Sequence, residues 1–169
     1  MRKRLSLVLI CAVLCLSGAC QSSDSIEPDG ARKVPEDFAF SLKFGAMALN
    51  GIDTYNGTLT KDLIEAGTEA ISYTLPAEQK ALIYDAFVAA DIPSIEKSVL
   101  NSMWSKPPLA FVFAYTCDGV TKEINCFDNP DEDEDEVTTR FLAFARGIVQ
   151  YVQGTAEWKN MPEAVGSYR

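Results

Sequence analysis

The chain has 169 residues, of which 24 are acidic and 15 basic, and it contains no histidine. A formal net charge of −9 at pH 7 disfavours a nucleic-acid ligand, because the phosphate backbone repels an acidic surface. The lack of histidine removes the usual general base, the usual partner of a nucleophile and the usual transition-metal ligand. We therefore expect no nucleic-acid partner and no cofactor.

The chain opens with the pattern of a secretory signal peptide. Arg2, Lys3 and Arg4 precede an apolar run over residues 5–16, and residues 17–19 are all small. A charged start, an apolar stretch and a small-residue cleavage site are typical of such a signal. The apolar run is shorter than the about 20 residues that a membrane-spanning helix needs. We predict a signal peptide over residues 1–19.

Cys20 follows the small residues directly. The residues from Leu16 to Cys20 resemble the lipobox of bacterial lipoproteins, although leucine usually lies three residues before the cysteine and Ser17 occupies that position here. The resemblance implies that the Cys20 thiol carries a lipid that holds the chain at a membrane, and two or more acyl chains anchor stably. The alternative is ordinary cleavage after Ala19, which leaves a free thiol.

The residue after Cys20 and the net charge of the mature chain indicate which membrane holds the anchor and how the chain is held there. Gln21 follows Cys20, which resembles sorting to the outer membrane if the organism has one; otherwise we expect the cell membrane. Removal of the signal leaves 12 basic and 24 acidic residues, a net charge of −12. Because anionic lipid repels such a body, the lipid anchor is what would hold it at the surface.

The mature chain divides into a tether and a domain. Residues 20–36 are polar after the cysteine and lack apolar periodicity, which predicts a lipidated Cys20 followed by a flexible tether. The mature chain of about 150 residues fits one hydrophobic core. We therefore predict a single domain over residues 37–169.

The domain begins with a run of predicted strands. Apolar side chains alternate with small or polar ones from Phe38 to Phe44, which is typical of a strand with one buried face. Asn56 and Gly57 predict a tight turn, because both residues tolerate positive φ. The further strands predicted in this part of the chain cover residues 52–55, 58–63 and 69–75.

Two helices are predicted farther along the chain. Pro76 suits the first position of a helix that Pro93 ends. A second helix follows the acidic residues 131–136 and runs to about Gln153. Strands that are segregated from helices favour the α+β class. We expect an antiparallel sheet of about four to six strands with both amphipathic helices packed on one face, in the order strands, helix, hairpin, helix.

The hairpin between the helices carries the last two cysteines. Its predicted strands are residues 109–117 and 120–127. The turn at Asp118-Gly119 places Cys126 opposite Phe111, roughly 20 Å along the ladder from Cys117 at about 3.3 Å per residue. A disulfide needs Cα atoms within about 7 Å, so we predict free thiols. A bridge would require a different turn or register.

Two segments of the domain resemble a protein family. Residues 55–62 read Tyr-Asn-Gly-Thr-Leu-Thr-Lys-Asp, and residues 161–163 read Met-Pro-Glu. They resemble an uncharacterised family of small bacterial lipoproteins and secreted proteins with an aromatic-x-Gly-Thr-x-Thr-Lys-Asp segment and a Leu-Pro-Glu-like tail. The resemblance covers residues 38–169 and implies a similar fold and export, but no activity. Lys61 and Asp62 are therefore candidate interaction residues, with a solvated strand end as the alternative.

Aromatic residues form a second group of candidates. Trp104 and Trp158, with Tyr115, would line a ligand surface if they lay together. The alternative is that they fill the core of a small domain, which is the commoner use of such side chains. We favour the core interpretation and keep both tryptophans as candidate interaction residues.

An acidic cluster precedes the second predicted helix. Asp131, Asp133 and Asp135 are weak candidates for calcium binding, because calcium prefers carboxylate oxygens. Their spacing matches no EF-hand loop, and the glycine of that loop is missing. The favoured alternative is a solvated helix start, where the helix dipole stabilises acidic side chains by about 0.3–1 kcal/mol each.

Two hypotheses for function follow from these patterns. The first is a membrane-anchored, non-catalytic binding module whose partner is an envelope protein or a component of the cell wall. The second is a carboxylate-dependent hydrolase of the cell wall or another glycan, which needs two carboxyl groups at a productive separation. Two carboxylates converging in a deep cleft would favour the hydrolase.

Overall fold

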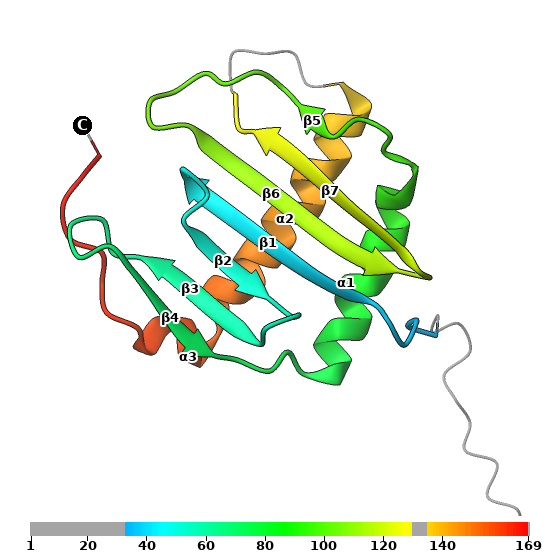
Figure 1. The fold of residues 1–169 in the computed structure, drawn as a ribbon, viewed down its shortest axis with the longest axis horizontal. Coiled ribbons are helices and arrows are strands. Elements are labelled where there is room, and N and C mark those ends of the chain that lie inside the picture. The colour runs from blue at the N-terminus through cyan, green and yellow to red at the C-terminus, as the bar shows by residue number, and fades with distance from the viewer. Residues whose placement is uncertain (1–32, 130–134, 169) are drawn as a thin grey trace, which may run out of the picture. The chain divides into compact units, whose positions relative to one another are not determined.

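The computed structural model describes residues 33–129 and 135–168. The predicted signal peptide, Cys20, Asp131 and Asp133 lie outside these residues. Within the described residues, the strands form one seven-stranded sheet in the order β4-β3-β2-β1-β6-β7-β5 (Figure 1). No helix in this part of the chain combines the length and apolar character that a membrane crossing requires.

The sheet joins a meander to a hairpin. The first four strands run antiparallel in chain order, and β1 also pairs with β6, which forms a hairpin with β7. The strands are β1 (Ala39–Ala46), β2 (Asn50–Asp53), β3 (Thr58–Asp62), β4 (Thr68–Ser72), β5 (Val99–Leu100), β6 (Leu109–Cys117) and β7 (Val120–Phe127). The helices are α1 (Ala77–Ala89), the 3₁₀ turn η1 (Ile92–Ser94), α2 (Glu136–Gly154) and α3 (Ala156–Asn160).

The core lies between one face of the sheet and the helices. Phe40 and Leu42 of β1 are fully buried on that face, as the alternation of the sequence predicts. Phe113 of β6 packs edge-to-face against Phe144 of α2, with ring centroids 5.0 Å apart. Helices α1 and α2 both lie behind the sheet in the view of Figure 1, and no helix of the described residues covers the opposite face.

The α+β class is confirmed, and α1 and α2 lie on one face of the sheet, but only Ile83 and Phe87 of α1 are buried and the prediction for the sheet is wrong in detail. The sheet has seven strands instead of four to six, and β5 runs parallel to β7 in an otherwise antiparallel sheet. Two residues are too few to show the alternation that reveals a strand, so the sequence predicts no strand at β5. The short helix α3 also escaped prediction; the Thr155 side chain caps it by accepting the N–H of Trp158.

The β2–β3 connection is longer than the predicted two-residue turn. Asp53 pairs with Thr58, so four residues form the connection. The Asp53 carboxylate accepts the backbone N–H groups of Tyr55 and Asn56 at 2.8 and 3.1 Å. These hydrogen bonds hold the wider turn, and Gly57 supplies its positive φ.

Candidate functional site

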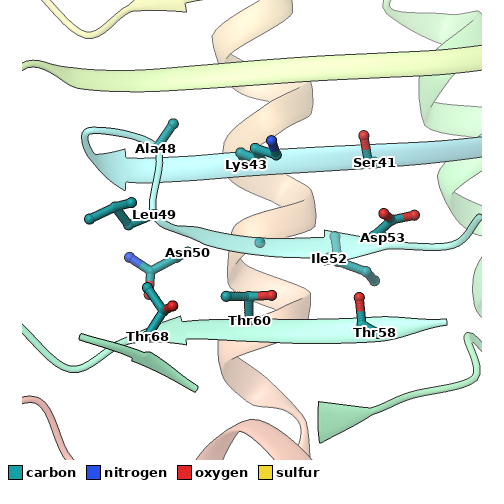
Figure 2. A pocket seen from close by; sticks show the side chains of 11 residues that line it. Ser41, Lys43, Ala48, Leu49, Asn50, Ile52, Asp53, Thr58, Thr60 and Thr68 are labelled. Atoms are coloured by element: carbon teal, nitrogen blue, oxygen red, sulfur yellow. The ribbon is translucent and has the colours of Figure 1, made fainter. Parts of the chain in front are cut away.

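The uncovered face of the sheet contains a hollow above Gly51. Lys43 of β1 and Thr60 of β3 are the cross-strand neighbours of Gly51 in β2. These three residues form one row across the strands. Because glycine has no side chain, the row has a gap between Lys43 and Thr60, and a cavity of about 270 Å³ forms there. Figure 2 shows Lys43 and Thr60 on opposite sides of this gap, with α2 behind the strands.

A second row of polar residues borders the same hollow. Ser41, Asp53 and Thr58 are cross-strand neighbours on β1, β2 and β3. Thr68 of β4 and Asn50 of β2 also line the cavity (Figure 2). The cavity is therefore lined by hydroxyl groups together with an ammonium, a carboxylate and an amide. We refer to this site as the Gly51 pocket.

Most of these polar groups are available to a ligand. The side chains of Lys43, Thr58 and Thr60 make no hydrogen bond or ion pair to the described residues. The hydroxyls of Ser41 and Thr68 are likewise unpaired within this part of the chain. A hydroxyl can both donate and accept, so together these groups can serve a ligand that presents donors and acceptors alternately.

The remaining two polar groups are fixed by the fold. Asn50 accepts the backbone N–H of Asp62 through Oδ1 at 2.9 Å. The two oxygens of Asp53 accept three hydrogen bonds, two from the turn backbone and one from the Asn56 amide at 2.7 Å. Asp53 is the one carboxylate among the residues that line the Gly51 pocket. The pocket thus presents no carboxylate pair of the kind that a glycan hydrolase uses.

Two of the residues predicted as interaction sites, Lys61 and Trp158, meet each other on the opposite, helix-covered face. Lys61 lies over the indole ring of Trp158, with Nζ 5.6 Å from the ring centroid. The same Nζ donates to the carbonyl of Met161 at 3.4 Å. Trp158 is 8% exposed and packs against Phe44 at a centroid distance of 5.8 Å. These contacts give Lys61 and Trp158 an intramolecular role.

Asp62 has a similar role at the end of β3. Its side chain is buried, Oδ1 accepts the backbone N–H of Ile64 at 2.9 Å, and Oδ2 accepts the hydroxyl of Tyr168. Val165 also donates its N–H to the carbonyl of Leu63 at 3.2 Å. The two segments that carry the family resemblance are therefore in contact, because the C-terminal tail is fastened to the end of β3.

The other candidate residues lie elsewhere. Trp104 is 53% exposed in the loop between β5 and β6, and the core interpretation is wrong for it. Asp135 caps α2 by accepting the N–H of Thr138 at 2.7 Å, and it pairs with Lys97 at 3.5 Å. The bonds from Thr138, and next the charge of Lys97, lower the pKa of Asp135. In the residues that the structure describes, no three side chains are grouped as metal ligands.

The cysteines of the hairpin lie as predicted. Cys126 is opposite Phe111 and Cys117 is opposite Val120. The two cysteines form no disulfide with each other, which confirms the prediction from register. Cys126 is 1% exposed and belongs to the core, whereas Cys117 is partly exposed and burial is the main cause that raises the pKa of its thiol.

Sequence reasoning missed the Gly51 pocket, although a signal for it exists. Ser41 and Lys43 alternate with buried residues of β1, and Thr58 and Thr60 do the same in β3. This pattern marks the polar face of each strand. The register between the strands decides which of these residues lie opposite one another, and the pattern does not give it. Comparison with protein-family models, curated proteins and solved structures finds no match to this chain.

Proposed function

We propose that this chain is a lipid-anchored lipoprotein of the bacterial envelope that acts as a non-catalytic binding module. The signal pattern, the lipobox-like residues ending at Cys20 and the polar tether support the anchor. The anchor lies in the outer membrane if the organism has one, and otherwise in the cell membrane. The partner is a component of the cell wall, bound on the uncovered face of the sheet.

The single observation that carries the binding proposal is the set of unpaired hydroxyls around the Gly51 pocket. Lys43 and Asp53 bring opposite charges to the lining, so a strongly charged ligand gains little there. Groups that donate and accept in alternation fit a neutral polyhydroxylated ligand. The cavity of about 270 Å³ is just below the roughly 300 Å³ at which small-molecule sites begin. We therefore assign the ligand to the saccharides, with one sugar unit in the pocket.

Calorimetric titration of the full chain with soluble N-acetylglucosamine oligomers and with wall-derived disaccharides tests this assignment. We expect binding that weakens about two- to tenfold in Thr60→Val, because that change removes one hydrogen-bonding hydroxyl at nearly constant volume. Ser72→Ala is the matched control, since Ser72 is an exposed hydroxyl outside the pocket. Equal binding by Thr60→Val and the original chain, or no binding of any saccharide, would overturn the assignment.

The anchor is tested separately, so that one part of the proposal can fail without the other. Cells that express the chain are grown with an alkyne-labelled fatty acid, and the label is then sought on the purified protein. We expect label and membrane retention in the original chain, and neither in Cys20→Ala. A labelled Cys20→Ala chain, or an unlabelled original chain in the membrane fraction, would contradict lipidation at this residue.

A further inference from the structure

The tip of the β6–β7 hairpin borders a second cavity, on the helix-covered face of the sheet. Tyr115 and Lys122 lie opposite each other across the hairpin, and Cys117 and Val120 do the same nearer the turn. Tyr115 packs against Phe87 of α1, with ring centroids 4.8 Å apart. Because residues two apart in a strand share a face, all four hairpin residues are on the face that the helices cover.

We refer to this site as the Tyr115 cavity. Its volume is about 470 Å³, within the range of roughly 300–1,000 Å³ that is typical of small-molecule sites. The 3₁₀ turn η1 closes one side of the cavity, because Lys122 donates from Nζ to the carbonyl of Pro93 at 3.4 Å. The lining includes Pro93, Tyr115, Cys117, Asp118, Val120 and Lys122.

Tyr115 brings an unused hydroxyl to this cavity. The residue is 2% exposed, and its side chain makes no hydrogen bond to the described residues. In this part of the chain, Nε of Arg140 is the one unpartnered side-chain nitrogen or oxygen that is completely buried, so the Tyr115 oxygen is not sealed inside the core. The hydroxyl therefore opens into the cavity that the residue lines. A buried tyrosine hydroxyl usually has a partner, and here a ligand can supply it.

The thiol of Cys117 lies beside this hydroxyl without pairing with it. After burial, the charge of Cys117 is the next cause that raises the pKa of Tyr115, which indicates that the two groups are near each other. The Cys117 S–H donates to the carboxylate of Asp118 at 3.7 Å instead. Burial, and next the charge of Asp118, raise the pKa of the thiol, so it is protonated at pH 7. A neutral thiol behaves as a small apolar group in the wall of the cavity.

The charges and apolar groups of the lining indicate which class of ligand fits. Asp118 and Lys122 bring one charge of each sign, so a strongly charged ligand gains little. The nearby carboxylate of Asp37 is occupied by the N–H groups of the β6–β7 turn. Val120 is 56% exposed, and a ligand in the cavity would cover this apolar side chain. The lining therefore favours a neutral ligand that is mostly apolar.

We propose that the Tyr115 cavity binds a small neutral molecule with an apolar body and one carbonyl or hydroxyl group, which pairs with the Tyr115 hydroxyl. The apolar body lies against Pro93, Cys117 and Val120. The cavity and the Gly51 pocket lie on opposite faces of the sheet. The proposal thus goes beyond the saccharide assignment and does not depend on it.

The probe for this site is prodan, a neutral naphthalene ketone whose emission moves to shorter wavelength when the dye leaves water. The parent protein is the full chain with Cys20→Ala, because an acyl chain would give the dye a second place to bind. We expect saturable binding that weakens about two- to tenfold in Tyr115→Phe, which removes one hydrogen-bonding hydroxyl and keeps the ring. Tyr168→Phe is the matched control, since it removes a phenol hydroxyl at the end of β3, outside the cavity.

Alkylation of Cys117 locates the dye on the parent chain without a further substitution. Iodoacetamide is applied at pH 9 with and without prodan, and mass spectrometry follows the peptide that contains Cys117. We expect alkylation to slow about tenfold at a dye concentration about ten times its Kd, because the bound molecule covers the thiol. Cys117→Leu, which extends a side chain into the cavity, should abolish binding. Ala114→Leu places the same side chain on the other face of β6 and should leave binding unchanged.

Four outcomes would overturn the proposal. The first is the absence of saturable prodan binding, and the second is equal affinity in Tyr115→Phe and the parent chain. The third is binding that leaves the alkylation rate of Cys117 unchanged, which would place the dye elsewhere. The fourth is prodan binding that Thr60→Val weakens, because that substitution changes the Gly51 pocket alone. Saccharide binding in a chain that fails these tests would leave the saccharide assignment intact.

Discussion

Lys61 of β3 lies over the indole ring of Trp158 in α3, with its Nζ 5.6 Å from the ring centroid. The two residues are distant in the sequence, and their contact joins the meander to the C-terminal helix. The tail continues from this point, and Tyr168 donates its hydroxyl to Asp62, the neighbour of Lys61. The end of β3 is consequently the place where the C-terminal segment is fastened to the sheet.

The contact between Lys61 and Trp158 predicts a loss of stability when the charge is removed. Lys61→Met keeps the aliphatic stem and deletes the ammonium, so we expect the free energy of unfolding to fall by about 0.5–1 kcal/mol. Urea unfolding measures the change. Lys43→Met is the matched control, because Lys43 has no partner among the described residues and its substitution should stay within about 0.5 kcal/mol. Equal losses in both variants would contradict a specific contact.

The hydrogen bond from Tyr168 to Asp62 predicts a contribution to stability that is lost at alkaline pH. This bond is the main cause that raises the pKa of Tyr168 above its usual value. A phenol with a raised folded-state pKa stabilises the fold below its unfolded value of about 10, and that contribution is lost as pH rises through the folded-state pKa. Tyr168→Phe should therefore have a lower free energy of unfolding than the original chain at pH 7, as measured by urea unfolding.

That difference should shrink once the pH exceeds the folded-state pKa of Tyr168, because the tyrosinate can no longer donate to Asp62. Ser167→Ala is the control, since Ser167 is an exposed neighbour in the tail. A difference between Tyr168→Phe and the original chain that is the same at neutral and alkaline pH would mean that the hydroxyl acts through packing and not through its proton.

The Asp37 carboxylate predicts the opposite pH dependence. It accepts the N–H groups of Gly119 and Asp118 at 2.7 and 3.0 Å, which caps the β6–β7 turn. The bond from Gly119, as the largest cause, lowers the pKa of Asp37. A lowered folded-state pKa stabilises the fold above the unfolded value of about 3.9, and the contribution is lost as pH falls through the folded-state pKa.

Asp37→Asn should thus be less stable than the original chain at pH 7, and the two should converge as the pH is lowered below 4. Urea unfolding at several pH values between 7 and 3 measures this. Asp85→Asn, at an exposed position on α1, controls for the loss of a surface carboxylate. A constant difference over the whole range would refute a role for the charge of Asp37.

Two glycines predict opposite effects of the same substitution. Gly147 lies in α2 with open space around an added Cβ, so Gly147→Ala should raise the free energy of unfolding by about 0.5–1 kcal/mol. A Cβ on Gly51 would meet the carbonyl oxygen of Leu42 at 3.0 Å, so Gly51→Ala should lower stability and partly fill the pocket. Thermal unfolding compares the pair. Equal stabilisation would show that Gly51 is not needed for close approach of β1 and β2.

The thiols of Cys117 and Cys126 predict stepwise reactivity. Cys117 is partly exposed, and burial with the charge of Asp118 raises the pKa of its thiol, so it should react slowly with Ellman's reagent at pH 8. Cys126 is 1% exposed and should react after unfolding in urea. Mass spectrometry of the purified protein should find both residues without a mutual disulfide. Rapid reaction of two thiols in the native state would contradict the burial of Cys126.

The sequence by itself determined part of the local structure of this protein. Alternation of side chains marked β1, the Asp118-Gly119 turn set the register of β6 and β7, and that register in turn placed Cys126 opposite Phe111. These features depend on interactions between residues that are near one another in the chain, so propensity and periodicity are sufficient to predict them.

Only the tertiary structure decided which strands and side chains are in contact with one another. β5 is a strand because it finds β7, and Lys61 and Asp62 have intramolecular roles because the C-terminal tail returns to them. The Gly51 pocket exists because β2 lies between β1 and β3 in one register, and β4 is an edge strand because no later strand of the described residues pairs with it. The contacts of β5 and of the C-terminal tail are made by segments distant in the sequence, whereas the Gly51 pocket depends on the register between consecutive strands. The energies of all these contacts depend on the whole core, which no single stretch of residues encodes.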